Sequence, residues 1–546
     1  MKKNIFRLLA VSAAVAFTTS CSKQIDEAYQ NPNADVRVPV ESLLPHLINC
    51  MTGNYGGHGP LHDTRYVGAY IQSFAWNSTL SNFDRMGYTN STADVAQSTW
   101  RMHYYDIGQN NNRMIEWALD EKKWDYAGAG QAIFGWSWLT LADYYGETIV
   151  NDAFNTSLAT FLYDPQEAAY ERAKNYCFAA LENLSKTGDN ASQANFALGD
   201  KYFYNGDAAK WKKFVYGVLA RYHNHFSNKA SYKADSVIYY ANLAMNDNAD
   251  NAVVRVPATA LSSTNSYFGP IRTNLTTNTA VNPAAIRQGA FVANLMNGTN
   301  PEFAGVNDPR AWYMLRGNTN GTIKGVEPSL GQTVIAAADR PENFWGSSQA
   351  AGVVNTAPAT QQGTYLFRNE SPVPVLTASE MYFLKAEAYW RKGDKTNALT
   401  AYKEGISKNF DMLTTTYNVN IKPGKEITPA VKTAYMADPA VVPTESGLNL
   451  SKIMLQKYIS LFVHGTLETW LDMRRFHYTD LDPSTGNQVY RGFVVPADLF
   501  PDNGGKTVQR MRPRFNSEYL WNIVELERIG ATRNDYHVQE LWITKP

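Results

Sequence analysis

The stretch SEMYFLKAEAYWRKGDKTNALTAYKEGI, residues 379–406, constrains the fold more than any other part of this sequence. Ala386, Ala398 and Gly405 are small residues, spaced as they are where the two antiparallel helices of a tetratricopeptide unit approach each other. The wedge between such helices is filled by large side chains, here Tyr382, Tyr389 and Tyr402. Lys385 stands where an aliphatic residue is usual, so the match is imperfect. Since one helix pair must stack on others to bury its apolar face, the pattern predicts a mainly α protein with a tetratricopeptide-like helix-pair superhelix.

Helical periodicity divides the rest of the chain into blocks. It is strong over about residues 95–250 and again over about 375–477, which predicts two runs of helical repeats. Between them, about residues 253–374 are dense in Asn, Thr, Gly and Pro and lack a sustained period. This composition predicts a large, irregular, loop-rich lobe, and long loops in compact proteins tend to carry function. The final segment, 478–546, is mixed.

The amino terminus has the pattern of a bacterial lipoprotein signal. A short basic region, MKKNIFR, precedes the apolar run LLAVSAAVAF, which is too short to span a bilayer, and small residues then lead to Cys21. We expect residues 1–20 to be a signal peptide and the Cys21 thiol to carry lipid. Residues 21–39 are polar and predict a flexible tether to a body of residues 40–546. The alternative is an ordinary secretory signal with a chance cysteine.

Charge and cysteine content exclude some classes of protein. The formal net charge is +0, with Lys+Arg 50 and Asp+Glu 50, so the basic excess typical of a nucleic-acid-binding protein is missing. Beyond Cys21 only Cys50 and Cys177 remain. They could pair in an oxidising compartment, but their spacing indicates neither a disulfide framework nor a metal site and favours buried thiols.

The segment HGTLETWLDMRR, residues 464–475, concentrates chemistry-bearing side chains. His464 and Glu468 are four residues apart, yet zinc needs three or four ligands and the usual two-histidine helix motif is absent. Gly465 is expected to start a new helix after His464. The segment therefore predicts no metal site.

The same helix has the pattern of a packing element. Its residues 467, 470, 471 and 474 recur at helical spacing, which gives a buried stripe with an arginine at its end. We expect Asp472 to pair with Arg475, and Arg474 to lie against Trp470. The segment is therefore interpreted as scaffold.

Motifs of enzymes are missing elsewhere too. The sequence has no GxSxG nucleophile elbow, no glycine-rich phosphate loop with a lysine, and no cysteine cluster. A pair of distant carboxylates could still meet in space, so an enzyme stays open as the less favoured interpretation. We expect no catalytic residue, no cofactor and no metal.

Ligand contacts are best sought where aromatic residues stand in loops beside amide and charged groups. A sugar presents a C–H face to an aromatic ring and hydroxyls to polar side chains, so that mixture suits a glycan. The segment SFAWNSTLSNFDRMGY supplies the first candidates, Trp76, Asn77, Asp84, Arg85 and Tyr88. The second candidates, from the irregular middle, are Tyr267 and Trp345. For every ring the alternative is that it staples a loop to the body.

Four groups of residues resemble a known family. They are Cys21 followed by Asn31-Pro32-Asn33; Tyr144-Tyr145-Gly146 with Gly206-Asp207 and Trp211-Lys212-Lys213; Glu380, Ala386, Glu387, Ala388 and Gly393; and Gln456-Lys457-Tyr458 with Gly465, Glu468, Trp470, Asp472 and Arg474-Arg475. Through them the chain resembles the SusD/RagB-like outer-membrane lipoproteins of the Bacteroidetes, over its whole mature length. It departs from the family pattern at Phe515 and Asn516, where Tyr and Pro are usual, although Glu518 and Asn522 remain. The acidic run that often follows the lipidated cysteine is reduced to Asp26-Glu27.

The resemblance implies a function and a partner. It implies helix pairs that support an irregular ligand-binding lobe, and an anchored position on the outer membrane facing the medium. It also implies capture of a nutrient, usually an oligosaccharide, and its delivery to a TonB-dependent SusC-like transporter. Capture of peptide by the same architecture is the alternative, followed by a tetratricopeptide-type protein-interaction scaffold.

Overall fold

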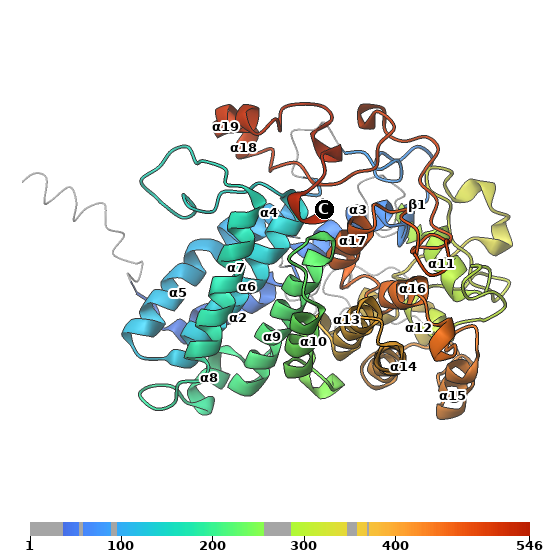
Figure 1. Ribbon diagram of the computed structural model, residues 1–546, viewed down its shortest axis with the longest axis horizontal. Helices are drawn as coiled ribbons and strands as arrows, with labels where there is room; N and C mark the ends of the chain where they lie inside the picture. Colours follow the sequence, from blue (N-terminus) through green and yellow to red (C-terminus); the bar gives the residue numbers. More distant parts are fainter. Residues whose placement is uncertain (1–36, 54–57, 89–94, 256–284, 347–357, 369–370) are drawn as a thin grey trace, which may run out of the picture.

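The computed structural model describes residues 37–53, 58–88, 95–255, 285–346, 358–368 and 371–546. Within these ranges the chain is mainly helical (Figure 1), which confirms the predicted fold class. The predicted signal peptide, Cys21 and Tyr267 lie outside the described residues. In the described part, every helix is too short or too polar to cross a membrane.

The amino-terminal half of the body is a stack of helices. In chain order they are α2 (Val40–Cys50), α3 (Pro60–Tyr70), α4 (Ser98–Arg101), a π-helix (Met102–Gly108), α5 (Gln109–Asp120), α6 (Trp124–Tyr145), α7 (Gln166–Asn183), α8 (Gln193–Gly199), α9 (Ala208–His225) and α10 (Ala234–Leu243). Helix α6 packs on α5, α7 and α9, and α9 packs on α10. Helix α6 is buried along almost its whole length, so it forms the centre of this block.

Close approach between α6 and α7 depends on glycine. A Cβ atom on Gly135 would lie 2.6 Å from the Sγ atom of Cys177, a separation that real side chains do not adopt. The two helices therefore come closer than ordinary side chains allow. Cys177 is buried in this contact, and neither it nor the buried Cys50 forms a disulfide, as the spacing of the cysteines favours.

The carboxyl-terminal helices form a second block beside the first (Figure 1). They are α13 (Ala378–Arg391), α14 (Lys395–Thr416), α15 (Pro429–Ala437), α16 (Leu450–Ser460) and α17 (Thr466–Arg475). Helix α13 packs on α14 and α16 within this block and on α9 and α10 of the other. The two blocks therefore share one continuous core.

The α13–α14 pair confirms the predicted tetratricopeptide-like unit. A Cβ on Gly405 would lie 2.9 Å from the ring of Phe383, so the small residue sets the distance between the helices. Tyr402 is fully buried and donates its hydroxyl to the Val441 carbonyl at 2.7 Å. Stabilisation of this pair comes from burial of such apolar and aromatic surface.

Lys385, the unusual residue of this unit, is accommodated by two contacts. Its ammonium lies 3.8 Å from the centre of the Tyr382 ring and donates to Oδ1 of Asn246 at 3.0 Å. Burial lowers the pKa of Lys385 to about 8. The cation is thus satisfied mainly by a ring face and an amide, with a weaker electrostatic contribution from Glu404.

Short elements characterise the middle of the chain. Strand β1 (Phe74–Trp76) pairs antiparallel with β3 (Ile286–Gln288), and β2 (Ala252–Val254) pairs antiparallel with β4 (Val373–Leu376). Among the described residues here, the α-helices are α11 (Ala290–Met296) and α12 (Ala311–Met314), and the other helical turns are 3-10 segments of three residues each. In Figure 1, α11 and α12 lie at the edge of the molecule away from α5 and α8. The boundaries 253–374 for an irregular lobe stay a prediction.

Short helices also occur later in the chain. Thr428 caps α15 by accepting from the backbone N–H of Val431, and Pro429 occupies its first turn. Near the carboxyl terminus, α18 (Glu518–Trp521) and α19 (Ile523–Arg528) are short. A short helix with a single buried residue, Tyr435 in α15, has too weak an apolar period to be recognised.

Candidate functional site

The predicted ligand segment around Trp76 is buried. Trp76 is only 2% exposed and sits in β1, where its backbone N–H donates to the Asp84 carboxylate at 3.1 Å. The same carboxylate accepts from the backbone N–H of Ser329 at 3.1 Å, so it joins the segment to the middle of the chain. Asn77 continues this connection through backbone hydrogen bonds with Ala285 and Gln332.

The remaining predicted residues also make internal contacts. Arg85 donates to the Asp498 carbonyl at 2.7 Å, and the Tyr88 hydroxyl donates to Asp502 at 2.8 Å. Trp345 is 3% exposed and lies edge-on to Phe367, with ring centres 5.3 Å apart. The structure therefore brings residues 76–88 together, and Trp345 lies in an aromatic cluster that reaches Phe74 in the same strand as Trp76.

Burial of these residues favours the stapling interpretation. A ring that stacks on a sugar must present a free face, and the faces of Trp76 and Trp345 lie against protein. Ligand contact by Trp76, Asn77, Asp84, Arg85, Tyr88 and Trp345 stays a prediction.

The contacts predicted within the helix of the segment 464–475 are confirmed. Gly465 precedes α17, and the guanidinium of Arg474 lies 3.7 Å from the centre of the Trp470 indole. Arg475 pairs with Asp472 at 2.7 Å. All four of these side chains are buried, so the helix holds its charges inside the core and not at a surface.

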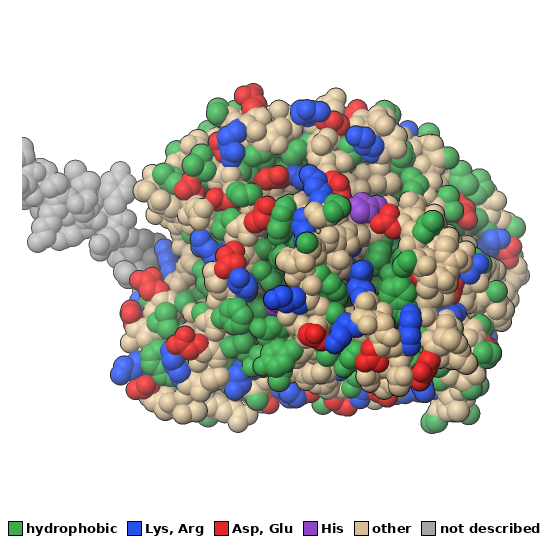
Figure 2. Space-filling model, in the orientation of Figure 1, with side chains coloured by type: hydrophobic (Ala, Val, Ile, Leu, Met, Phe, Trp, Pro, Cys, Tyr) green, Lys and Arg blue, Asp and Glu red, His purple; other side chains and the backbone are tan. Residues whose placement is uncertain are grey.

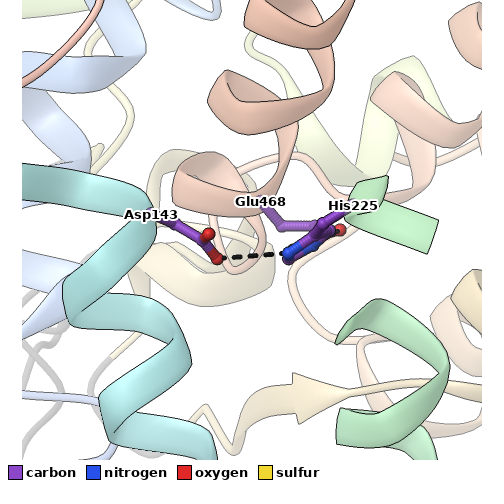
Figure 3. A group of neighbouring side chains, drawn as sticks. All are labelled: Asp143, His225 and Glu468. Atoms are coloured by element: carbon purple, nitrogen blue, oxygen red, sulfur yellow. Dashed lines mark hydrogen bonds and ion pairs between the residues drawn. The ribbon is translucent and has the colours of Figure 1, made fainter. Parts of the chain in front are cut away.

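Glu468 of this helix belongs to a cluster that the sequence did not reveal. Figure 3 shows Asp143 from α6, His225 from the end of α9 and Glu468 from α17 facing one another. His225 Nε2 lies 3.1 Å from the Glu468 carboxylate, and Nδ1 lies 3.5 Å from Asp143. The hydroxyl of Tyr170 donates to Asp143 and lies 3.2 Å from His225 Nδ1.

Protein cations surround the cluster. Arg221 Nε and Lys457 Nζ lie 3.6 and 3.5 Å from the Glu468 carboxylate. Burial opposes ionisation of Glu468, but His225, Arg221 and Lys457 hold its pKa well below the ordinary value. Burial raises the pKa of Asp143 to about 6, although the neighbouring His225 acts in the other direction. The negative charge at this point is therefore compensated by the protein itself.

The protein cations beside the cluster disfavour a bound metal ion. Its three possible ligand groups lie within 4.8 Å of one another, but a divalent ion there would face the nearby Arg221 and Lys457. The adjoining cavity has a volume of about 50 Å³, room for a few water molecules. His464 lines this cavity, and burial lowers its pKa to about 3, so it is neutral at physiological pH. The cluster is an ion-pair network that connects α6, α9, α13, α16 and α17.

The signal that could have revealed the cluster is weak. Arg221 and His225 are four residues apart, on the same face of α9, where the rest of the buried surface is mostly apolar. Two polar residues on a core-facing stripe predict buried partners. They do not identify those partners, which lie on α6, α13 and α17.

The family landmark Gln456-Lys457-Tyr458 also connects separate parts of the fold, because each of its side chains contacts a different segment. The Gln456 amide oxygen accepts from Arg310 at 2.6 Å, and Lys457 pairs with Asp472 at 2.7 Å. The Tyr458 hydroxyl donates to the Ile71 carbonyl at 2.9 Å. Consecutive side chains of α16 thus fix the middle segment, α17 and the turn after α3.

The carboxyl-terminal landmark also joins distant segments. Glu518 accepts from the Tyr163 hydroxyl at 2.9 Å. Asn522 forms two hydrogen bonds with the backbone of Phe161, accepting at 3.2 Å and donating at 2.9 Å. These contacts hold the loop after α6 against α18.

The surface shown in Figure 2 carries acidic and basic side chains interspersed, with no large region of one sign. The formal net charge is +0, so the net charge itself does not favour binding of a polyanion. The fold and the buried charge networks define the class: a helical-repeat scaffold whose most chemistry-rich segments maintain the architecture.

Comparison with known proteins identifies the family. A model of the SusD-like family, described as starch-binding and associating with the outer membrane, matches residues 33–497. The chain therefore belongs to the SusD-like family, which includes the SusD/RagB proteins of the Bacteroidetes. No protein in the curated set matches the sequence.

Solved structures agree on the fold. A SusD/RagB family protein from Bacteroides thetaiotaomicron has a TM-score of 0.67 and 21% identity, covering 93% of this chain and 99% of its own. A SusD homolog from Bacteroides fragilis has a TM-score of 0.66 and 18% identity, covering 93% and 100%. A chitin-binding SusD homolog from Flavobacterium johnsoniae has a TM-score of 0.64 and 17% identity, covering 92% and 98%.

Proposed function

We propose that this protein is a cell-surface lipoprotein that captures an oligosaccharide and delivers it to a TonB-dependent SusC-like transporter. The family match over residues 33–497 carries the proposal, since that family is described by starch binding and association with the outer membrane. The amino-terminal pattern ending at Cys21 supplies the anchor, because acyl chains contribute about 0.8 kcal/mol for each buried CH₂ group.

Binding without chemical change is part of the proposal. The acidic and basic side chains of the helix in the segment 464–475 are buried and paired with other residues of the protein. The small cavity beside them has no room for a sugar ring. These observations support a binding protein in preference to a hydrolase.

The ligand surface is proposed for the loops around residues 76–88 and for the irregular middle, with Tyr267 and Trp345 as further candidates. Arg85 and Asp498, a partly exposed ion pair at 3.4 Å, mark the accessible edge of this region. Because one SusD homolog of similar fold is described as chitin-binding, chito-oligosaccharides belong in the first panel of ligands.

Affinity electrophoresis against immobilised polysaccharides tests ligand capture. We expect retarded migration on at least one polymer, and retention on a peptide matrix alone would instead favour the peptide alternative. Membrane fractionation tests the anchor: the wild-type protein should sediment with the outer membrane, and Cys21→Ala should release it. Co-purification with a TonB-dependent barrel from detergent extracts tests the partner, and a protein recovered alone under all conditions would contradict that part.

A further inference from the structure

A groove lies on the body apart from residues 76–88. It is bounded by the end of α4 and the π-helix, by the loop that follows α6, and by the stretch just before α18. Figure 1 shows α4, α18 and the loop between α6 and α7 at the same end of the molecule. Its volume of about 580 Å³ falls in the usual range for small-molecule sites, roughly 300–1,000 Å³.

Aromatic rings line the groove, and the backbone is irregular where it presents them. The rings are Trp100, Tyr104, Tyr105, Phe154 and Phe161. Tyr104 and Tyr105 lie in the π-helix, a conformation that is rare and concentrated at functional sites. Phe154 adopts φ +65°, in the left-handed region that a bulky residue seldom occupies. Two separate backbone irregularities thus meet at one groove.

Of the two tyrosines in the π-helix, Tyr104 is held by hydrogen bonds, whereas Tyr105 is exposed. The Tyr104 hydroxyl donates to the Ile149 carbonyl at 2.8 Å and accepts from the Ile149 N–H at 3.0 Å, which makes it a rigid wall. Tyr105 is 70% exposed. The guanidinium of Arg101 lies 5.0 Å from the centre of the Tyr105 ring, close enough for a cation–π contact. A largely open tyrosine ring beside a guanidinium can serve as a stacking platform for a ligand.

Arg101 is the charged group of the groove that has no counter-ion among the described residues. No described residue forms an ion pair or hydrogen bond with Arg101, and its Nε atom is buried. Arg514 also lines the groove, and its charge acts on the neighbouring Glu518 carboxyl, so it is not counted as a free cation. The one carboxylate in the lining, Glu518, is already held by Tyr163 and Asn522. Among the described residues, the Arg101 guanidinium therefore has no anionic partner, and carboxylates and phosphates are the groups that a guanidinium binds most strongly.

We infer that this groove is a second ligand site, which takes a carboxylate-bearing sugar unit of an acidic oligosaccharide. The sugar's C–H face stacks on Tyr105, and its carboxylate accepts hydrogen bonds from Arg101. The sugar character of the ligand rests on the proposed function, whereas the stacking and the positive charge come from the groove itself. A neutral sugar would use the ring but leave Arg101 without an anion.

Isothermal titration of the mature protein tests the site. The probes are oligogalacturonates and, at matched length, neutral chito- and malto-oligosaccharides. We expect the oligogalacturonate to bind at least tenfold more tightly than the neutral sugars. Arg101→Gln and Tyr105→Ala should each weaken that binding about tenfold or more, whereas Tyr105→Phe should retain it. Tyr239→Ala, which removes a tyrosine 60% exposed on α10, is the matched control and should change nothing.

The outcomes separate this site from the proposed function. Binding of neutral sugars that no groove variant alters, with no preference for the acidic one, overturns the second site and leaves the proposed function standing. Binding of a glutamate-rich peptide as tight as that of the oligogalacturonate overturns the sugar assignment. If no glycan binds in any arm, both proposals fall. Thermal melting of each variant checks folding, which is expected to be intact because Tyr105 is mostly exposed.

Discussion

Arg475 and Glu387 are separated by 88 positions in the sequence, yet they meet in a double hydrogen bond with both side chains fully buried. The two distances are 2.9 and 3.0 Å, and the pair joins α17 to α13. A charge buried this deeply is costly without its partner. The pair therefore makes the packing of the two helices strictly dependent on both residues.

Glu387→Gln should expose this dependence. The substitution keeps the shape but removes the charge, so Arg475 keeps only Asp472 as a counter-ion. We expect a loss of about 3–5 kcal/mol in the free energy of unfolding, measured by denaturant titration. Glu404→Gln on the exposed face of α14 is the control and should cost less than about 0.5 kcal/mol. A loss below about 1 kcal/mol for Glu387→Gln would contradict a network that depends on the pair.

Asp84→Asn should change the pH dependence of stability. Burial raises the pKa of Asp84 from 3.8 to about 8, so its contribution to stability is full below pH 3.8 and is lost as the pH rises through about 8. The wild type should therefore lose stability relative to Asp84→Asn over that window, with a slope that approaches about 1.4 kcal/mol per pH unit. Unfolding free energies at pH 5 and pH 8 measure the difference. If the free energies of unfolding of the two proteins changed equally with pH, Asp84 would be ionised in the folded state.

Gly135→Ala should destabilise the α6–α7 contact through a clash with Cys177. Overpacking of this kind costs about 1–3 kcal/mol. Because the clash involves the sulfur, Cys177→Ala should recover part of the loss, and the double mutant should be more stable than the sum of the single changes predicts. Thermal unfolding of all four proteins gives the coupling energy. Strict additivity would mean that the helices move apart freely.

The contacts of His477 with Asp480 and Glu540 should stabilise the protein at neutral and acidic pH and lose this effect at high pH. Its hydrogen bond to Asp480, despite partial burial, together with Glu540, raises its pKa to about 9. The stabilisation is complete below pH 6.5 and disappears as the pH rises through about 9. His477→Gln should therefore lower the melting temperature at pH 6 and have little effect at pH 10. Since the side chain is 40% exposed, the effect should stay below about 1 kcal/mol, and an equal loss at both pH values would contradict it.

Local patterns predicted the scaffold well. Arg474 over Trp470 and Asp472 with Arg475 are contacts within one or two turns of a single helix, so their spacing alone indicates them. The tetratricopeptide-like pair was equally accessible, because Gly405 lies close in sequence to the α13 ring that it accommodates.

The surroundings of the candidate site residues could not be predicted, because they depend on contacts between residues far apart in the sequence. Trp76 is buried because β1 pairs with β3, more than 200 positions later, and nothing in the segment 73–88 indicates that partner. His225 is similar, since its partners Asp143 and Glu468 come from two other helices. The groove at Tyr105 depends on a π-helix, and a helical period read from the sequence does not distinguish that conformation from an ordinary helix.

The most direct test of the account is to mix the purified mature protein with a panel of oligosaccharides and to analyse each sugar after separation. The account predicts that at least one sugar binds reversibly and is recovered at its original length, because a fixed helical scaffold presents a surface for capture and its buried acid–base groups remain out of reach. Shortened sugar products, or no binding to any member of the panel, would contradict it.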